Sequence, residues 1–138
     1  MNSYNVQVLL DGPRNTVAKV DISLDGVSGD YAEQQIILDP RTLSSYGPSM
    51  RDGPKSRLLR VDDLDWDIQN GLSVNVFWEG VGTTPLWRMV GRSREKAWHF
   101  GGLQNNADQP TGRITFTTTS TAGGPLFATF RVQTVKQP

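Results

Sequence analysis

The sequence predicts an all-β fold, an antiparallel β-sandwich of about eight or nine strands, and a jelly roll is the expected topology. Three observations lead to this prediction. Apolar and polar residues alternate along most of the chain, which is the period of a strand with one buried face. Fourteen glycines and eight prolines separate the alternating stretches. Only a turn or two of helix is expected, at 39–45. An immunoglobulin-like strand order is the alternative, because alternation does not reveal which strands pair.

The first three strands are expected between residues 4 and 38. The turn sequence DGPRNT, at 11–16, separates the first two, and Asp39-Pro40 ends the third, QQIIL. Apolar residues occupy every second position of the first two strands: Tyr4, Val6, Val8 and Leu10, then Ala18, Val20, Ile22 and Leu24. A length of 138 residues predicts that all strands belong to one domain, 1–138, with a single core.

The longest irregular segment is DPRTLSSYGPSMRDGPKS, residues 39–56, with three prolines and two glycines. At its start, Asp39 can cap a helical turn that has Pro40 in the first position. Loops of this length are often functional or ordered by a partner. A Greek-key sandwich also needs long crossovers, so both interpretations of this loop remain open.

Four of the fourteen acidic residues fall in DDLDWDIQNG, residues 62–71, where Asn70-Gly71 predicts a β-hairpin. A three-residue loop, 69–71, with Gly71 in the left-handed conformation pairs Ile68 with Leu72. A two-residue turn would instead put carboxylates beside an apolar row, at a high desolvation cost. With the longer loop, the apolar face holds Leu64, Trp66, Ile68, Leu72, Val74, Val76 and Trp78, and the solvated face holds Asp63, Asp65, Asp67, Ser73, Asn75 and Phe77.

The same acids leave a cation site as an alternative. Asp63, Asp65 and Asp67 match the start of a calcium-binding loop, but Ile68 stands where its sharp turn needs glycine. Carboxylates two residues apart on a strand are separated by about 6 to 7 Å, which suits one ion poorly. We therefore favour a solvated or interfacial face and assign no metal site. A bulge is expected at 62–63, because the apolar positions before it are out of phase with those after it.

The second half of the chain continues the strand pattern. TPLWRMVGR, at 84–92, and EKAWHF, at 95–100, predict two less regular strands. Ile114 and Phe116, and then alternate residues from Leu126 to Val132, predict the last two. Six residues are expected in the core: Trp66, Trp78, Val74, Val76, Phe116 and Phe130.

Composition argues against several kinds of function. Fourteen basic and fourteen acidic residues cancel, so no nucleic-acid partner is expected. No apolar run is long enough to span a bilayer, so no membrane partner is expected, and the chain is expected to be unexported. There is no cysteine, and His99 is the only histidine, which leaves no multi-histidine metal site within one chain. With no GxSxG motif and no distinct carboxylate pair, we expect neither enzymatic activity nor a cofactor.

The candidate interaction residues are large or basic side chains on irregular segments. Arginine and aromatic side chains are enriched in the cores of protein interfaces. The segment 39–56 contributes Arg41, Leu43, Tyr46, Met50, Arg51 and Lys55, and the stretch GRSREKAW contributes Arg92 and Arg94. As an alternative, Trp87, Trp98 and Phe100 could form a stacking platform for a sugar.

Five segments, in chain order, carry a resemblance to a known family: LDGPRNTV, IILDPRTLSS, LRVDDLDWDIQNGLSVNVFWEG, FGGLQNNADQPTGRITFTTTS and VQTVKQ. They resemble small virion structural proteins of tailed bacteriophages. Among these, the chain is most similar to capsid-stabilising proteins, also called decoration or cement proteins, which bind the outer shell. No residue-level motif for capsid binding can be carried over to this sequence.

The resemblance implies a jelly-roll β-sandwich without enzymatic activity that binds the major capsid protein at subunit junctions. It also implies assembly in the host cytoplasm and a final place on the outer capsid surface of the virion. We expect a homo-oligomer, a dimer or a trimer. Many copies bound to one shell turn modest contacts into strong attachment, so no single site need be tight. The alternative function is a carbohydrate-binding or receptor-binding module of a phage tail or surface appendage.

Overall fold

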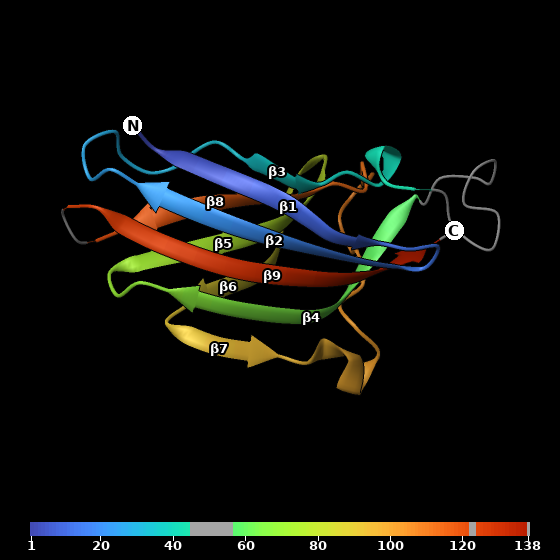
Figure 1. Cartoon of the computed structure of the whole chain (residues 1–138). Helices are drawn as coiled ribbons and strands as arrows, with labels where there is room; N and C mark the ends of the chain where they lie inside the picture. Colours follow the sequence, from blue (N-terminus) through green and yellow to red (C-terminus); the bar gives the residue numbers. More distant parts are fainter. Residues whose placement is uncertain (45–56, 122–123, 138) are drawn as a thin grey trace.

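The computed structural model describes residues 1–44, 57–121 and 124–137, which form a sandwich of two antiparallel sheets (Figure 1). The predicted all-β sandwich is confirmed. Two short 3₁₀ helices, η1 (Pro40–Thr42) and η2 (Ala97–Phe100), interrupt the strands. The strands are β1 (Ser3–Asp11), β2 (Asn15–Leu24), β3 (Gln35–Leu38), β4 (Leu58–Ile68), β5 (Leu72–Gly80), β6 (Gly82–Val90), β7 (Arg92–Glu95), β8 (Ile114–Ser120) and β9 (Leu126–Gln137).

The strands follow the order of a jelly roll. One sheet has the order β1-β2-β9-β4-β7, and the other has the order β3-β8-β5-β6. Eight strands pair from the outside of the sequence inward: β2 with β9, β3 with β8, β4 with β7 and β5 with β6. The chain therefore folds as one long hairpin that is wound into two layers. β1 extends the five-stranded sheet by pairing with β2.

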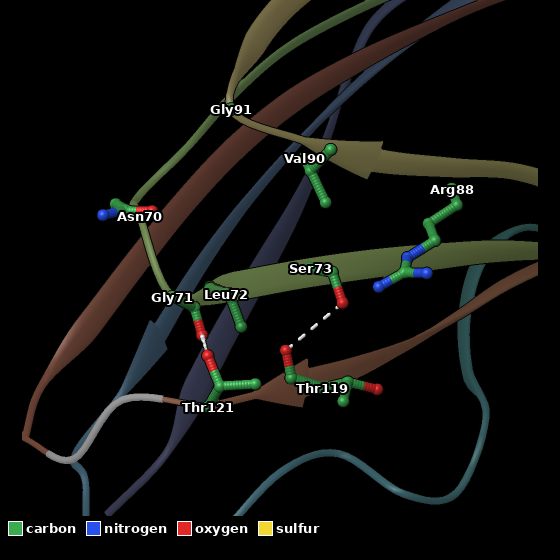
Figure 2. Close-up of a pocket in the computed structure, with 9 residues that line it drawn as sticks. All are labelled: Asn70, Gly71, Leu72, Ser73, Arg88, Val90, Gly91, Thr119 and Thr121. Carbon is green, nitrogen blue, oxygen red and sulfur yellow. Dashed lines mark hydrogen bonds between the residues drawn. The ribbon is translucent and has the colours of Figure 1, made fainter.

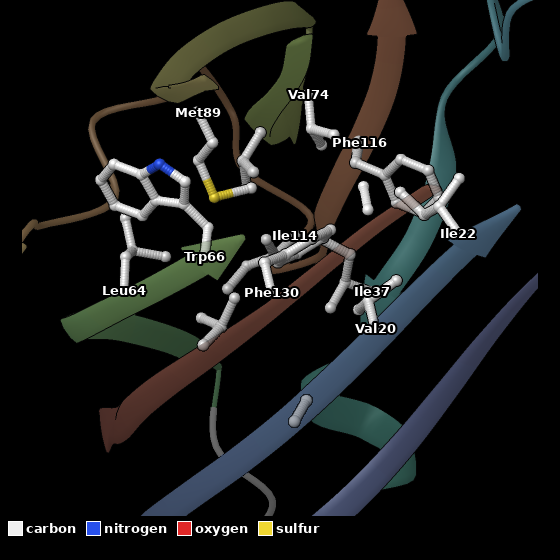
Figure 3. Close-up of a cluster of buried hydrophobic side chains, with 14 of the residues drawn as sticks. Val20, Ile22, Ile37, Leu64, Trp66, Val74, Met89, Ile114, Phe116 and Phe130 are labelled. Carbon is white, nitrogen blue, oxygen red and sulfur yellow. The ribbon is translucent and has the colours of Figure 1, made fainter. Parts of the chain in front are cut away.

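The core lies between the two sheets, where the inward-facing side chains interlock (Figure 3). All six expected core residues are buried, and Trp66 is the most exposed of them at 7%. The indole Nε1 of Trp66 donates a hydrogen bond to the Val90 carbonyl at 3.0 Å. Because Trp66 belongs to β4 and Val90 to β6, this bond joins the two sheets across the core.

The predicted hairpin between β4 and β5 is wrong. β4 pairs with β9 and β7, whereas β5 pairs with β8 and β6, so the connection 69–71 crosses from one sheet to the other. The loop itself is as expected: Gly71 has a φ of 93°, and the Leu72 N–H donates to the Gln69 carbonyl at 3.1 Å. All seven apolar residues predicted on one face are buried, because a connection between facing sheets also turns both strands inward.

Four other local predictions can be compared with the structure. The bulge at 62–63 is confirmed as a shift in the β4–β9 register between Val61 and Asp63. The helical turn is confirmed as η1, where the Asp39 side chain accepts a hydrogen bond from the Arg41 N–H. EKAWHF, however, is not a strand, because residues 97–100 form η2. The stretch 84–92 is divided between the sheets at Gly91, whose φ is 66°.

Candidate functional site

The described chain stops at Ser44 and resumes at Arg57, and both residues lie at one end of the sandwich. We call this end the loop end. Here β1 and β9 finish and β4 begins (Figure 1). The last described residue before the segment 45–56, Ser44, is hydrogen-bonded to Asp11 and Lys136. The first residue after it, Arg57, donates its N–H to the Gln137 carbonyl at 3.2 Å. Both flanks of the segment are therefore fixed to the end of β9.

A buried lysine organises the first flank. The Lys136 side chain is 0% exposed, and its Nζ contacts the Asp11 Oδ1 and the Gly12 carbonyl at 2.6 Å each. The Ser44 carbonyl and Oγ lie 2.9 Å from the same nitrogen. An ammonium group has three protons to donate, and all of them find acceptors here. The cluster therefore holds backbone segments together and offers no free nucleophile.

Asp11 is the counter-ion in this cluster. Its carboxylate also accepts hydrogen bonds from the Ser44 N–H and Oγ, each at 2.8 Å. Burial by itself would raise the pKa of Asp11, but the bonds from Lys136 and Ser44 outweigh it and hold this pKa below its ordinary value. Asp11 therefore remains an anion as long as the loop end is folded at neutral pH.

A second ionic group lies at the same end, around the η1 cap. The Asp39 carboxylate contacts Arg41 Nε at 3.2 Å and Arg113 Nε at 3.0 Å, and Arg113 also contacts Glu79 at 3.3 Å. Burial opposes ionisation of Asp39, but hydrogen bonds from the two arginines lower its pKa. The bond to Asp39 likewise raises the pKa of Arg113. These contacts connect the ends of β3 and β5 to the start of β8.

The candidate contact residues of 39–56 differ in their exposure to solvent. Arg41 is exposed, with 62% of its side chain accessible, and it lies at the loop end. Leu43 is only 4% exposed and belongs to the core, so its assignment as a contact residue is corrected. The apolar side chain belongs to the core cluster and does not face solvent. The remaining candidates lie outside the described residues: Tyr46, Met50, Arg51 and Lys55.

The other two candidates, Arg92 and Arg94, lie far from η1, on β7 at the opposite edge of the five-stranded sheet (Figure 1). They are exposed and stand opposite Asp67 and Asp65. Arg94 reaches Asp63 at 2.6 Å, and its pKa is raised chiefly by that hydrogen bond. The structure therefore does not bring these arginines together with Arg41.

The acidic stretch is the polar outer surface of β4, as expected, but only in part. Asp67 is exposed, and Asp65 contacts Arg131 of β9 at 3.1 Å. Asp63 and Ser73, which were both predicted on the solvated face, are buried at 5% and 6%. Asp63 is paired with Arg94, and Ser73 Oγ donates a hydrogen bond to the Thr119 carbonyl. Among the residues that the structure describes, no three histidine, cysteine, aspartate or glutamate residues gather in a way that could hold a metal ion.

Two of the three candidate platform aromatics are exposed. Trp98 and Phe100, on η2, are 53% and 61% exposed, and Trp98 packs edge-on against His99 with ring centroids 4.0 Å apart. Trp87 is different, because it is half-buried and packs against the core at the β6 edge. Trp98 and Phe100 are therefore the two exposed members of the predicted platform.

At the end of the sandwich away from the loop end, β5, β6 and β8 surround a shallow hollow of ≈ 250 Å³ (Figure 2). Ser73 Oγ donates to the Thr119 carbonyl at 3.3 Å, and Thr121 Oγ1 donates to the Gly71 carbonyl at 3.4 Å. Of the described residues that line it, Arg88 is the one with a charge, and none is a carboxylate or a histidine. These described residues therefore supply no acid–base pair for catalysis.

Lys136 was not among the residues predicted from the sequence, although the alternating pattern of β9 indicates its inward position. Leu126, Ala128, Phe130 and Val132 face the core in alternation, and extending this period by four residues places Lys136 on the same face. A lysine at an inward position requires a partner. That partner could not be identified from the sequence, because Asp11 lies at the far end of the chain.

Comparison with known proteins adds no assignment. No protein-family model, curated protein or solved structure matches this chain. No helix in the described ranges is long and apolar enough to cross a membrane.

Proposed function

We propose that this chain is a bacteriophage capsid decoration protein, which binds the outer surface of the major capsid protein shell and stabilises it. The proposal begins from the resemblance of its segments to capsid-stabilising proteins. The structural observation that supports it is the fixation of both flanks of 45–56 on the end of β9, through Lys136 and Gln137. Both flanks are therefore fixed at one end of the sandwich, and connections held on a sheet scaffold commonly carry binding residues.

The proposed action is a clamp across neighbouring capsid subunits. A protein that binds the assembled shell and not free subunits stabilises the shell by mass action. Arg41, exposed beside the segment, supplies a charge at the rim, where charges mainly set orientation and rate of association. Many copies on one shell would make the attachment strong without any single tight site. In this proposal the protein is a homo-oligomer of the virion and has no catalytic role.

The proposal can be tested by co-sedimentation with purified tailed-phage capsids that lack their own decoration protein. The intact chain should bind and should raise the temperature at which the shell falls apart. Replacing 46–55 with a glycine–serine linker of equal length should abolish binding, because Ser44 and Arg57 still anchor the linker while the contact side chains are gone.

Arg88→Glu provides the matched control, because Arg88 lies in the hollow away from the loop end. It should bind like the intact chain. Full occupancy by the linker variant would place the contact elsewhere on the molecule, and failure of the intact chain to bind any capsid would refute the function itself.

The alternative, a glycan-binding or receptor-binding module, is supported by one observation, the exposure of Trp98 and Phe100 on η2. Exposed aromatic rings stack on sugars, and two such residues in one turn give a small platform. Binding on a glycan array that is lost in Trp98→Ala would favour this function over capsid decoration. An array without any signal would count against it.

A further inference from the structure

The four edge strands of the sandwich differ in how they are protected from pairing with another chain. An unprotected edge offers a row of free N–H and C=O groups, and proteins usually shorten, charge or interrupt it. β3 and β7 are only four residues long, and β7 carries Arg92, Arg94 and Glu95. β6 contains Pro85 and faces a bulge between Val76 and Phe77. Three of the four edges therefore carry at least one protective feature.

β1 is the least protected of the four edges. It is nine residues long and has neither a charge nor a proline from Ser3 to Leu10. Its one irregularity is a shift between Val8 and Leu10, near the loop end. Within the described chain, the backbone-to-backbone hydrogen bonds of β1 go to β2 alone, and the Asp11 carbonyl also accepts a hydrogen bond from Ser44 Oγ at 3.2 Å. Figure 1 shows β1 as the outermost strand of the five-stranded sheet.

The side chains of β1 are also unusually exposed for apolar residues. Tyr4 and Val8 stand opposite Ile22 and Ala18, both buried, so they lie on the core side of the sheet. They are nevertheless 37% and 45% exposed, although the Tyr4 ring packs edge-on against Tyr31 and Phe116. A further strand beside β1 would cover part of this apolar surface.

We propose that a second copy of this chain supplies that strand, with two β1 strands paired antiparallel around a two-fold axis at Val6. The inference deepens the proposed function, since it names the surface through which copies of the decoration protein associate. The two five-stranded sheets then become one continuous sheet, with both cores on the same side. The contact is isologous and therefore closes as a dimer.

The β1 sequence fits this register on both faces. On the core side, Tyr4 of one copy faces Val8 of the second copy, and the two Val6 residues face each other. On the outer side, Asn5 of one copy faces Gln7 of the second, so amides meet amides. A shift by one residue would place core-side residues opposite outer-side residues, which the pleat of a continuous sheet does not allow. No like charges oppose each other in the pairing from Ser3 to Leu9.

The register predicts how charges at Asn5 and Gln7 affect association. Both side chains are exposed in the monomer, so substitutions there should leave the fold intact, as far-UV circular dichroism can verify. Asn5→Lys with Gln7→Lys puts lysine opposite lysine twice across the axis and should raise the dimer Kd about tenfold or more. The matched variant, Asn5→Lys with Gln7→Glu, puts lysine opposite glutamate and should remain a dimer. Sedimentation equilibrium over a range of concentrations measures both.

A single cysteine gives a second, independent test, because the chain has none of its own. Val6→Cys should form a covalent dimer on oxidation, since cross-strand neighbours on an antiparallel pair are close enough for a disulfide. Val90→Cys, exposed on the β6 edge, should not. A chain that is monomeric at all concentrations, or a dimer that resists the double-lysine variant, overturns this interface.

The capsid assay remains a separate readout. A monomer that still co-sediments with capsids would refute the β1 interface and leave the decoration function standing. A β1 dimer that binds no capsid would do the reverse.

Discussion

Two ionic clusters in this protein use the same chemistry in different surroundings. At the loop end, Lys136 and Asp11 are 2.6 Å apart, and on the outer face of the five-stranded sheet Arg94 and Asp63 are also 2.6 Å apart. The distances are equal, but Lys136 is 0% exposed and Arg94 is 48% exposed. An exposed partner can exchange its bond for water, whereas a buried ammonium cannot. Exposure, rather than distance, should therefore decide what each pair contributes to stability.

The largest effect is expected from Asp11→Ala. This substitution leaves the Lys136 ammonium buried with only neutral acceptors, and breaking such a pair costs about 3 to 5 kcal/mol. The free energy of unfolding from urea denaturation should fall by that amount.

Lys136→Met is the matched comparison for Asp11→Ala. It leaves Asp11 with 28% of its side chain exposed to water and with its two bonds from Ser44, so it should cost clearly less. The double variant should be more stable than Asp11→Ala alone. Equal losses in the two single variants would contradict this account of the cluster.

The dependence of the free energy of unfolding on acid pH should distinguish the wild type from Lys136→Met. Because the pKa of Asp11 is lowered in the folded state, its stabilising contribution is complete above its ordinary pKa near 3.8 and is lost as the pH falls through the folded value. The wild type should therefore lose stability below about pH 4. Lys136→Met removes a bond that lowers this pKa and should show a shallower decline. The pKa of Asp39 is also lowered, so Asp39 makes stability fall with pH in the same way. This contribution is the same in the wild type and in Lys136→Met, and it cancels when the two are compared.

An intermediate effect is expected from Arg94→Ala. The Asp63 carboxylate has only 7% of its side chain exposed and would lose its partner. The urea midpoint of Arg94→Ala should fall less than that of Asp11→Ala, because removing the exposed Arg94 side chain also lets water reach Asp63. A midpoint equal to that of the wild type would contradict this account of the Arg94–Asp63 pair.

The smallest effect is expected from Arg131→Ala. Arg131 and Asp65 are 46% and 47% exposed, and pairs of this kind contribute about 0.2 to 1 kcal/mol. The loss should shrink further when the unfolding experiment is repeated in 1 M salt, which screens exposed charges. A loss comparable to that of Asp11→Ala would reverse the ranking by exposure.

The sequence predicts which residues are buried better than which strands pair. Alternation correctly placed the apolar residues of β4 and β5 on the core side, because that pattern reports only the face of a strand. It could not tell a hairpin from a connection between sheets, since both turn the strands inward. The pairing of β4 with β9 depends on residues that are distant in the sequence, and no local signal contains it.

The candidate site shows the same limit. The exposed positions of Arg41, Arg92 and Arg94 follow from charge and strand period. Leu43 was assigned to the surface because its neighbours are turn residues, yet η1 folds it back onto the core. The cluster of Lys136 joins both ends of the chain, so only the three-dimensional structure reveals it.

The nested pairing of the jelly roll has a consequence for the order in which the protein is made. β9 is synthesised after the other eight described strands, and yet it lies between β2 and β4, pairing Asn15 with Val135. A ribosome adds about 5 to 20 residues per second, so β2 waits seconds for its neighbour. Folding then requires closure over nearly the whole chain, which places it among slow, high-contact-order folders, in the range of about milliseconds to seconds. Until β9 emerges, the facing edges of β2 and β4 both stand open, and aggregation of the nascent chain competes with completion of the sheet.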